Sequence, residues 1–454
     1  CEIHTFAWIS HYRTGGRIHT SPPSTPKDSM NDATITAVTG HRRWDSRGRP
    51  TVEAVVTTTS GTGRALAPAG ASTGSGEALD LRDGGDRFDG LDVTTAVSNI
   101  SERIAPALIG LDAADQTTVD AALESLDPSV GFSELGGNAV VAVSLANAHA
   151  AAASRGEPLW RTVLGPGVEV AGTVALPVPE IQIFGGGAHA HRRIDIQDLM
   201  VVPRGATSFA QALDWTAEIY RAAGRWMDDR GLRMGVADEG GWWPALDTNQ
   251  QALDALTAAI EAAGLEPVTQ VGIALDIAAS QFGRNGRYRL GREERELDTA
   301  AMIDLLVSWV DRYPIVSVED PVAEDDPAGM AAFTAATGER IQVVGDDFLV
   351  TDADRVARAA EDRSANTVLI KPNQAGTLTR ARAALDAAHA RGLQTIVSAR
   401  SGETEDVSVA HLAVGWGSNG VKVGSITRGE RTAKWNEMLR IEESLGDRAR
   451  GLRR

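Results

Sequence analysis

The sequence has almost no cysteine and no long apolar run. Cys1 is the only cysteine among 454 residues, which excludes a disulfide framework and a thiolate metal site. The most apolar stretch, 139–153, is interrupted by Ser144, Asn147 and His149, so it falls short of the ~18 consecutive apolar residues that a membrane span needs. We therefore expect a cytoplasmic protein without a membrane partner.

Basic residues are also fewer than acidic residues. The chain has 44 lysines and arginines against 61 aspartates and glutamates, a formal net charge of −17. This balance argues against nonspecific binding to nucleic acid or to an anionic membrane. A few buried cations can still form a local site for a small anionic substrate, because a pocket depends on the charges that line it.

The pattern along the chain predicts two domains. Residues 1–29 have no clean period and a Ser/Pro cluster at 21–26, which indicates a flexible N-terminal extension. Residues 30–165 begin with extended Val- and Thr-rich segments and continue with three stretches of helical period, the order typical of an α+β domain.

From residue 166 to 446, short apolar runs alternate with amphipathic segments of helical period. The runs number eight, which predicts a (β/α)8-type barrel, with 447–454 left as a C-terminal tail. A doubly wound open sheet is the alternative, but no Gly-rich fingerprint follows the first run. The expected strands are 198–202, 234–237, 271–275, 315–318, 341–344, 367–370, 395–397 and 420–423.

Ionisable residues close seven of these runs: Glu239, Asp276, Glu319, Asp346, Lys371, Arg400 and Lys422. In a barrel, the strand ends converge on one catalytic face, so we expect these side chains to meet there. Three of the carboxylates come from consecutive strands with no cysteine or histidine beside them, and oxygen-only ligands favour Mg²⁺.

Lys371 and Lys422 are then expected to lie across the pocket from the metal. A lysine near another ammonium and a dication has its neutral form favoured, so it can act as a general base. Mg²⁺ opposite such a base is suited to stabilising an enediolate after proton removal next to a carboxylate. Two Gly-rich segments, 68–74 and 185–191, are small-residue loops able to close over a substrate.

Taken in order, these motifs resemble enolase, the phosphopyruvate hydratase family, from about residue 45 to residue 446. The matching stretches are Asp45-Ser46-Arg47-Gly48, Gly70-Ala71-Ser72-Thr73-Gly74, Asp238-Glu239-Gly240-Gly241, Ser317-Val318-Glu319-Asp320-Pro321, Gly345-Asp346-Asp347 and Arg400-Ser401-Gly402-Glu403-Thr404-Glu405-Asp406. The resemblance implies an enolase barrel behind an N-terminal α+β domain. It also implies a homodimer or a higher homo-oligomer.

The resemblance assigns roles residue by residue. It implies that Asp276, Glu319 and Asp346 hold one Mg²⁺ and that Ser72 helps to bind a second Mg²⁺ with the substrate phosphate. It implies Lys371 as the general base, Glu239 as the general acid, and Asp198 as part of the acid-side network. The implied substrate contacts are Arg400 and Ser401 to phosphate, Lys422 to carboxylate, and His189 from the closing loop.

The chain also departs from the family pattern inside the site. Ala399 stands where the family has a histidine, and Asp198 stands where it has a glutamate. Ala69 replaces a usual serine, and Trp242-Trp243 replaces the usual Phe-Ala. The metal and base machinery is kept while the dehydration side is altered, so we expect proton abstraction to survive better than dehydration.

Three functions are compatible with these residues. The first is a Mg²⁺-dependent lyase that converts 2-phosphoglycerate, or a close analogue, to a phosphoenolpyruvate-type product. The second is a transferase acting on a phosphonate substrate, such as carboxyphosphonoenolpyruvate synthase of phosphonate antibiotic biosynthesis. The third is a noncatalytic relative, which the intact set of acids and lysines disfavours.

Overall fold

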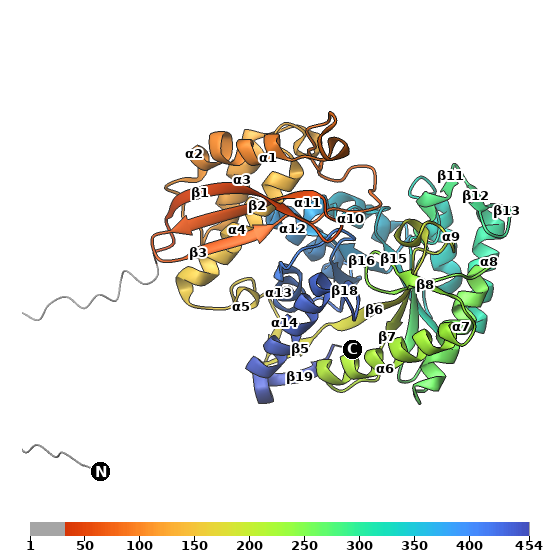
Figure 1. The fold of residues 1–454 in the computed structure, drawn as a ribbon. Helices are drawn as coiled ribbons and strands as arrows, with labels where there is room; N and C mark the ends of the chain where they lie inside the picture. Colours follow the sequence, from red (N-terminus) through yellow and green to blue (C-terminus); the bar gives the residue numbers. More distant parts are fainter. Residues whose placement is uncertain (1–31, 454) are drawn as a thin grey trace, which may run out of the picture.

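A computed structural model of the chain describes residues 32–453 (Figure 1). The extension expected at residues 1–29 lies outside these described residues. The N-terminal domain is an antiparallel sheet in the order β1–β2–β3, covered on one face by helices. Its elements are β1 (Ile35–Trp44), β2 (Pro50–Thr58), β3 (Thr62–Leu66), α1 (Thr94–Asn99), α2 (Ala105–Leu108), α3 (Gln116–Leu126), α4 (Gly137–Arg155) and α5 (Leu159–Thr162).

The Ala-rich helix α4 is the core of this domain. It is buried along nearly its whole length, because it packs between the sheet and the second domain. Gly63 on β3 permits the close approach, since a Cβ there would lie 2.1 Å from the backbone nitrogen of Ala150. A larger residue at position 63 would therefore push α4 away from the sheet.

The second domain is a closed barrel of eight strands, as the sequence predicts. Neighbours follow the order β18–β17–β16–β15–β14–β10–β7–β6, and β18 pairs with β6 to close it. The strands are β6 (Val178–Gly185), β7 (Asp198–Val202), β10 (Gly272–Asp276), β14 (Ile315–Glu319), β15 (Gln342–Gly345), β16 (Thr367–Ile370), β17 (Gln394–Ser398) and β18 (Gly420–Ser425). One strand breaks the parallel pattern: β7 runs antiparallel to both β6 and β10.

Helices surround the barrel (Figure 1). They are α6 (Phe209–Asp228), α7 (Asn249–Ala262), α8 (Thr299–Arg312), α9 (Pro327–Thr337), α10 (Ala353–Glu361), α11 (Pro372–Ala375), α12 (Leu378–His389), α13 (Ser408–Gly415) and α14 (Gly429–Leu445). Six of the longer helices begin with a Ser, Thr or Asp side chain that accepts a hydrogen bond from the first turn, as at Ser208 and Thr248. None of the helices within residues 32–453 combines the length and the apolar character that crossing a bilayer requires.

The identity of one barrel strand differs from the sequence expectation. The run 234–237 is not a barrel strand: β8 (Arg233–Val236) forms a hairpin with β9 (Trp242–Pro244) at the end of the sheet. Met234 is 53% exposed, so this apolar run does not indicate burial. The missing strand is β6, whose apolar pattern is hidden by Pro179 and Glu180.

Smaller sheets flank the barrel. The segment expected as a tail, 447–454, contains β19 (Ala449–Leu452), which pairs with β5 (Thr173–Leu176); β5 pairs in turn with β4 (Glu169–Val170). The third sheet joins β11 (Gly283–Arg284), β12 (Arg287–Leu290) and β13 (Arg295–Asp298).

Candidate active site

The expected site residues gather at one end of the barrel. Asp276 and Glu319 are the last residues of β10 and β14, and they are register partners on adjacent strands. Asp346, Lys371 and Arg400 follow β15, β16 and β17, and Lys422 lies within β18. Each of these six side chains is buried. Parallel strands of matched length explain the convergence, because their carboxyl ends share one rim.

Lys422 lies between two of the expected metal ligands. Its ammonium donates to Asp276 Oδ2 and to Glu319 Oε2, each at 2.8 Å. Burial lowers the pKa of Lys422, but Asp276 and Glu319 outweigh it and hold the pKa well above its usual value. Lys422 is therefore an ammonium in this arrangement; the neutral form expected beside a dication stays a prediction.

Lys371 is paired with the third expected ligand. Its ammonium donates to Asp346 Oδ2, while Asp346 Oδ1 accepts from Gln374 at 3.0 Å. Burial lowers the pKa of Lys371, but the Asp346 carboxylate raises it by more, so this lysine is also charged here. A base role for Lys371 therefore requires that another cation takes its place on Asp346.

A second group of acids surrounds Asp346. Ligand oxygens of Asp320, Asp346 and Asp347 lie within 4.8 Å of one another. The carboxylate of Asp320 accepts the backbone N–H groups of Asp346 (2.9 Å) and Asp347 (2.8 Å), which fixes the loop after β15. Burial and the Asp346 charge raise the pKa of Asp347 to about 7. The sequence reasoning did not single out Asp320 or Asp347, although an acid directly following another at a strand end is the available signal.

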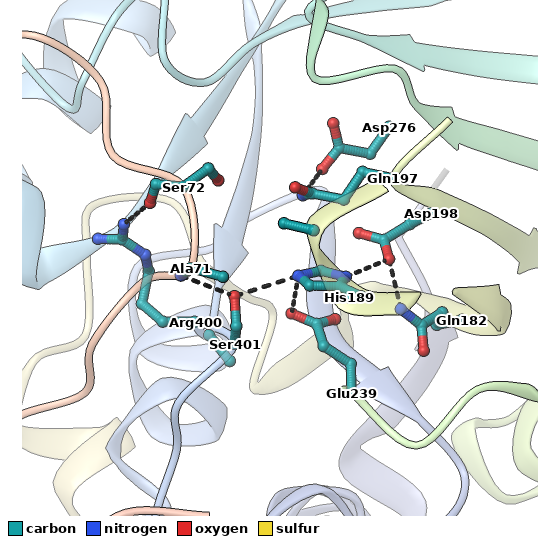
Figure 2. Close-up of polar contacts among 12 residues, drawn as sticks. Ala71, Ser72, Gln182, His189, Gln197, Asp198, Glu239, Asp276, Arg400 and Ser401 are labelled. Carbon is teal, nitrogen blue, oxygen red and sulfur yellow. Dashed lines mark hydrogen bonds and ion pairs between the residues drawn. The ribbon is translucent and has the colours of Figure 1, made fainter. Parts of the chain in front are cut away.

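The acid side of the site is organised by His189 (Figure 2). Its Nδ1 lies 2.9 Å from Asp198 Oδ1, and its Nε2 lies 3.2 Å from Ser401 Oγ and 3.8 Å from Glu239 Oε1. Burial lowers the pKa of His189, but Asp198 and Glu239 raise it to about 9. Burial and Asp198 raise the pKa of Glu239, which favours a protonated acid.

Gln182 of β6 forms hydrogen bonds with this group and with a neighbouring turn. Its amide N–H donates to Asp198 Oδ1, and its oxygen accepts the backbone N–H of Gly241 at 2.7 Å. Gln182 thus links Asp198 to the turn that carries Glu239. The turn lies between β8 and β9, so Glu239 reaches the rim from a hairpin and not from a barrel strand.

The N-terminal domain also contacts the site residues. Arg400 donates to the carboxylate of Glu77 (2.9 Å) and to the backbone carbonyl of Ser72 (2.9 Å). The backbone N–H of Ala71 donates to Ser401 Oγ at 3.1 Å (Figure 2). Among the residues that the structure describes, no hydrogen bond joins Ser72 to the three expected metal ligands. Glu77 was missed by the sequence reasoning, because nothing in its local pattern marks it as the partner of a distant arginine.

The donor set fits a hard divalent cation. Asp276, Glu319 and Asp346 offer only oxygens, and Glu319 Oε1 is buried without a hydrogen-bond partner. Burial and the Asp276 charge raise the pKa of Glu319 well above its usual value, a strain that a bound cation relieves. Gln197 steadies the group by donating to Asp276 Oδ2 at 3.0 Å. These three carboxylates do not form one compact cluster here, since the two lysines hold them.

An aromatic contact lies beside the loop at residues 186–191. His191 stacks on Trp243, with ring centroids 5.2 Å apart and planes at 28°. His191 (φ 49°) and Arg192 (φ 56°) both have left-handed backbone, which costs energy for residues with a side chain. The stack therefore holds a strained turn directly after His189.

Comparison with protein-family models gives two matches. The model described as "Enolase, N-terminal domain" matches residues 35–163. The model described as "Enolase, C-terminal TIM barrel domain" matches residues 173–451, which is more than half of the chain. The two matched regions correspond to the sheet-and-helix domain and to the closed barrel.

Proposed function

The chain belongs to the enolase family, and we propose that it removes the proton next to the carboxylate of 2-phosphoglycerate, or of a close analogue, to form a phosphoenolpyruvate-type product. The family supports a Mg²⁺-dependent enzyme that acts on a small phosphorylated substrate. The observation that carries the proposal is the convergence of Asp276, Glu319, Asp346 and two buried lysines on one rim of the barrel.

Asp276, Glu319 and Asp346 would hold Mg²⁺, with Ser72 helping to bind a second ion. When bound, the ion stabilises the negative charge that develops on the substrate carboxylate as the proton leaves. Lys422, which is next to Asp276 and Glu319, is placed to bind the substrate carboxylate. Arg400 and Ser401 would bind the phosphate, since Arg400 is a fully buried guanidinium at the domain boundary.

Lys371 would take the proton. Its ammonium is held by Asp346 in this structure, and it becomes available as a base when that carboxylate is engaged elsewhere. Glu239 would donate a proton to the leaving hydroxyl, because burial and the Asp198 charge raise its pKa and so favour its protonated form. His189 would orient Glu239 and Ser401 from the loop at residues 186–191.

A second candidate function is a transferase such as carboxyphosphonoenolpyruvate synthase, acting on a phosphonate substrate. The observation in its favour is Ala399, which precedes Arg400 and is 7% exposed. An apolar methyl group at this position offers no donor to a phosphate and leaves more room than an imidazole. The acid side also departs from the family pattern, because Asp198 stands where the family has a glutamate. Its carboxylate accepts a hydrogen bond from Gln182.

The two functions are separated by one pair of measurements. Purified protein with Mg²⁺ and 2-phosphoglycerate in deuterated water should exchange the α-proton, as followed by NMR. Phosphoenolpyruvate formation, followed by ultraviolet absorbance, should be much slower than exchange. If the protein showed no exchange and no turnover, the lyase would be excluded. Fast turnover would exclude the transferase. Light scattering after size-exclusion chromatography tests the homodimer that the family resemblance suggests.

A further inference from the structure

Glu180 is a buried carboxyl group that the proposed function does not use. It lies on β6 and is 3% exposed. Within residues 32–453, its side chain makes no hydrogen bond or ion pair to another residue. A carboxyl group in such a buried position is stabilised by a nearby cation, so the cations on neighbouring strands are the groups to consider.

The strand pattern directs Glu180 into the barrel. Two residues earlier, Val178 packs against Met200 and Ala274, a cluster separate from the main core. Two residues later, Gln182 reaches Asp198 in the site. Alternate residues of a strand share one face, so Glu180 lies between the apolar interior and the catalytic rim.

Lys422 is the cation on the neighbouring strand. Lys422 and Glu180 are register partners in the parallel pairing of β18 with β6, and adjacent strands lie about 4.8 Å apart. The side chain of Lys422 extends to Asp276 and Glu319, as described above. Burial raises the pKa of Glu180 to about 7 against the opposing effect of Lys422, so the nearby ammonium already influences this carboxyl group.

The present position of Lys422 conflicts with cation binding. Its ammonium occupies the oxygens of Asp276 and Glu319 that would ligate Mg²⁺. A dication and an ammonium repel each other at such distances in a buried site, so one must leave. A displaced, buried ammonium needs a new anion, since an unpaired buried charge is strongly unfavourable.

We propose that Glu180 receives the ammonium of Lys422 when a divalent cation occupies Asp276 and Glu319. Glu180 is then a positioning residue, which keeps Lys422 charged and beside the substrate site. The inference rests on the proposed function only in assigning the cation to Asp276 and Glu319.

Titration calorimetry with MgCl₂ alone tests the inference without substrate. Glu180→Gln keeps the shape and removes the charge, and it should weaken Mg²⁺ binding by about tenfold, the equivalent of 1.4 kcal/mol. Glu180→Asp should recover part of the affinity. Glu261→Gln, an exposed change on α7, removes the same charge far from Lys422 and should leave the affinity unchanged. Thermal unfolding of each variant checks that it is folded.

The lysine dependence distinguishes this role from general electrostatics. Lys422→Met removes the competing ammonium and should tighten Mg²⁺ binding. In the Lys422→Met background, Glu180→Gln should not change the Mg²⁺ affinity further, because the protein then has no Lys422 ammonium for Glu180 to pair with. An equal loss in both backgrounds would overturn the inference, and so would a Glu180→Gln protein that binds Mg²⁺ like the wild type. Failure of the wild type to bind Mg²⁺ would overturn the proposed function as well.

Discussion

Asp198 lies directly opposite Asp276 in the register of β7 and β10, although Asp198 begins its strand and Asp276 ends its own. The antiparallel direction of β7 makes this possible, since its first residue is at the end of the barrel where its neighbours finish. Two acids with different partners thus lie side by side at this end of the barrel. Asp276 belongs to the cation side with Lys422, and Asp198 belongs to the acid side with His189.

Asp346→Asn should weaken Mg²⁺ binding and reduce activity by about a thousandfold or more. The change removes one of three charges that hold the cation, and hard-ion affinity follows the number of carboxylates. Calorimetry with Mg²⁺ and the α-proton exchange assay provide the measurements. Asp386→Asn, in an exposed ion pair with Arg382, serves as the charge-matched control. Full Mg²⁺-dependent turnover by the Asp346 variant would contradict the metal assignment.

Lys371→Met should abolish exchange of the substrate α-proton with deuterated water. Methionine fills the space of the lysine stem but cannot accept a proton. Binding of Mg²⁺ should persist and become tighter, because Asp346 loses its competing ammonium. NMR of the substrate gives the exchange rate and calorimetry gives the affinity. Continued exchange at the wild-type rate would place the base on another residue.

The wild type should convert 2-phosphoglycerate to phosphoenolpyruvate slowly or not at all, and the double change Ala399→His with Asp198→Glu should raise the rate. An imidazole at position 399 restores a donor next to Arg400, and the longer acid restores reach on the dehydration side. Steady-state absorbance measurements on both proteins test the point. Ordinary enolase rates in the wild type would mean that His191 or a water supplies the lost function. Gln182 bonds the present Asp198, so the double variant also needs a check of its folding.

The folded protein without metal should lose stability as the pH rises from about 6.5 to 9. Protonated His189 is stabilised chiefly by the ionised Asp198, with its pKa raised from 6.5 to about 9. The contribution is fully present below 6.5 and is lost as the pH passes through 9, by at most about 3 kcal/mol. Asp198, with its pKa lowered to about 2, remains ionised throughout this range.

Urea unfolding at a series of pH values measures this slope. His189→Gln should flatten it between pH 6.5 and 9, whereas His41→Gln, an exposed change on β1, should leave it as in the wild type. An unchanged slope in the His189 variant would show that another group titrates.

Trp243→Ala should make the loop after His189 several-fold more sensitive to trypsin. His191 stacks on Trp243, and the next two residues are arginines at which trypsin cleaves. Without the stack, the left-handed turn at His191 and Arg192 loses its support and should open more often. Mass spectrometry of early fragments locates the cut. Trp243→Phe keeps a stacking ring and should be cleaved nearly as slowly as the wild type; equal rates for all three proteins would contradict the role of the stack.

The sequence predicts the positions of Asp276, Glu319 and Lys371 better than the position of Glu239. Asp276, Glu319 and Lys371 follow regular parallel strands, so a one-dimensional reading of strand ends is enough to bring them together. Glu239 lies in the turn of the β8–β9 hairpin. The prediction that it follows a barrel strand at 234–237 was therefore wrong. The irregular strand pair β6–β7 is where the simple barrel pattern fails.

Other contacts depend on residues far apart in the chain. Glu77 binds Arg400 across the domain boundary, and nothing near either residue predicts the partner. Glu180 interrupts the apolar pattern of β6, and the same feature concealed both the strand and the buried acid. The charge state of the lysines also could not be read from the sequence, because it depends on which carboxylates they reach in the absence of a cation.

The seam between β6 and β18 has a consequence for synthesis of the protein. Val178 pairs with Gly420, so the barrel closes only when its first strand, β6, pairs with its last strand, β18. On the ribosome, the hairpin of β6 and β7 can form early from local contacts, while its outer edge has no partner until β18 emerges. That edge includes Glu180 and is a template for pairing with other chains during the delay. Glu180 and the prolines at 177 and 179 both disfavour such pairing, since a charge does not suit a sheet edge and proline cannot donate a hydrogen bond to a neighbouring strand.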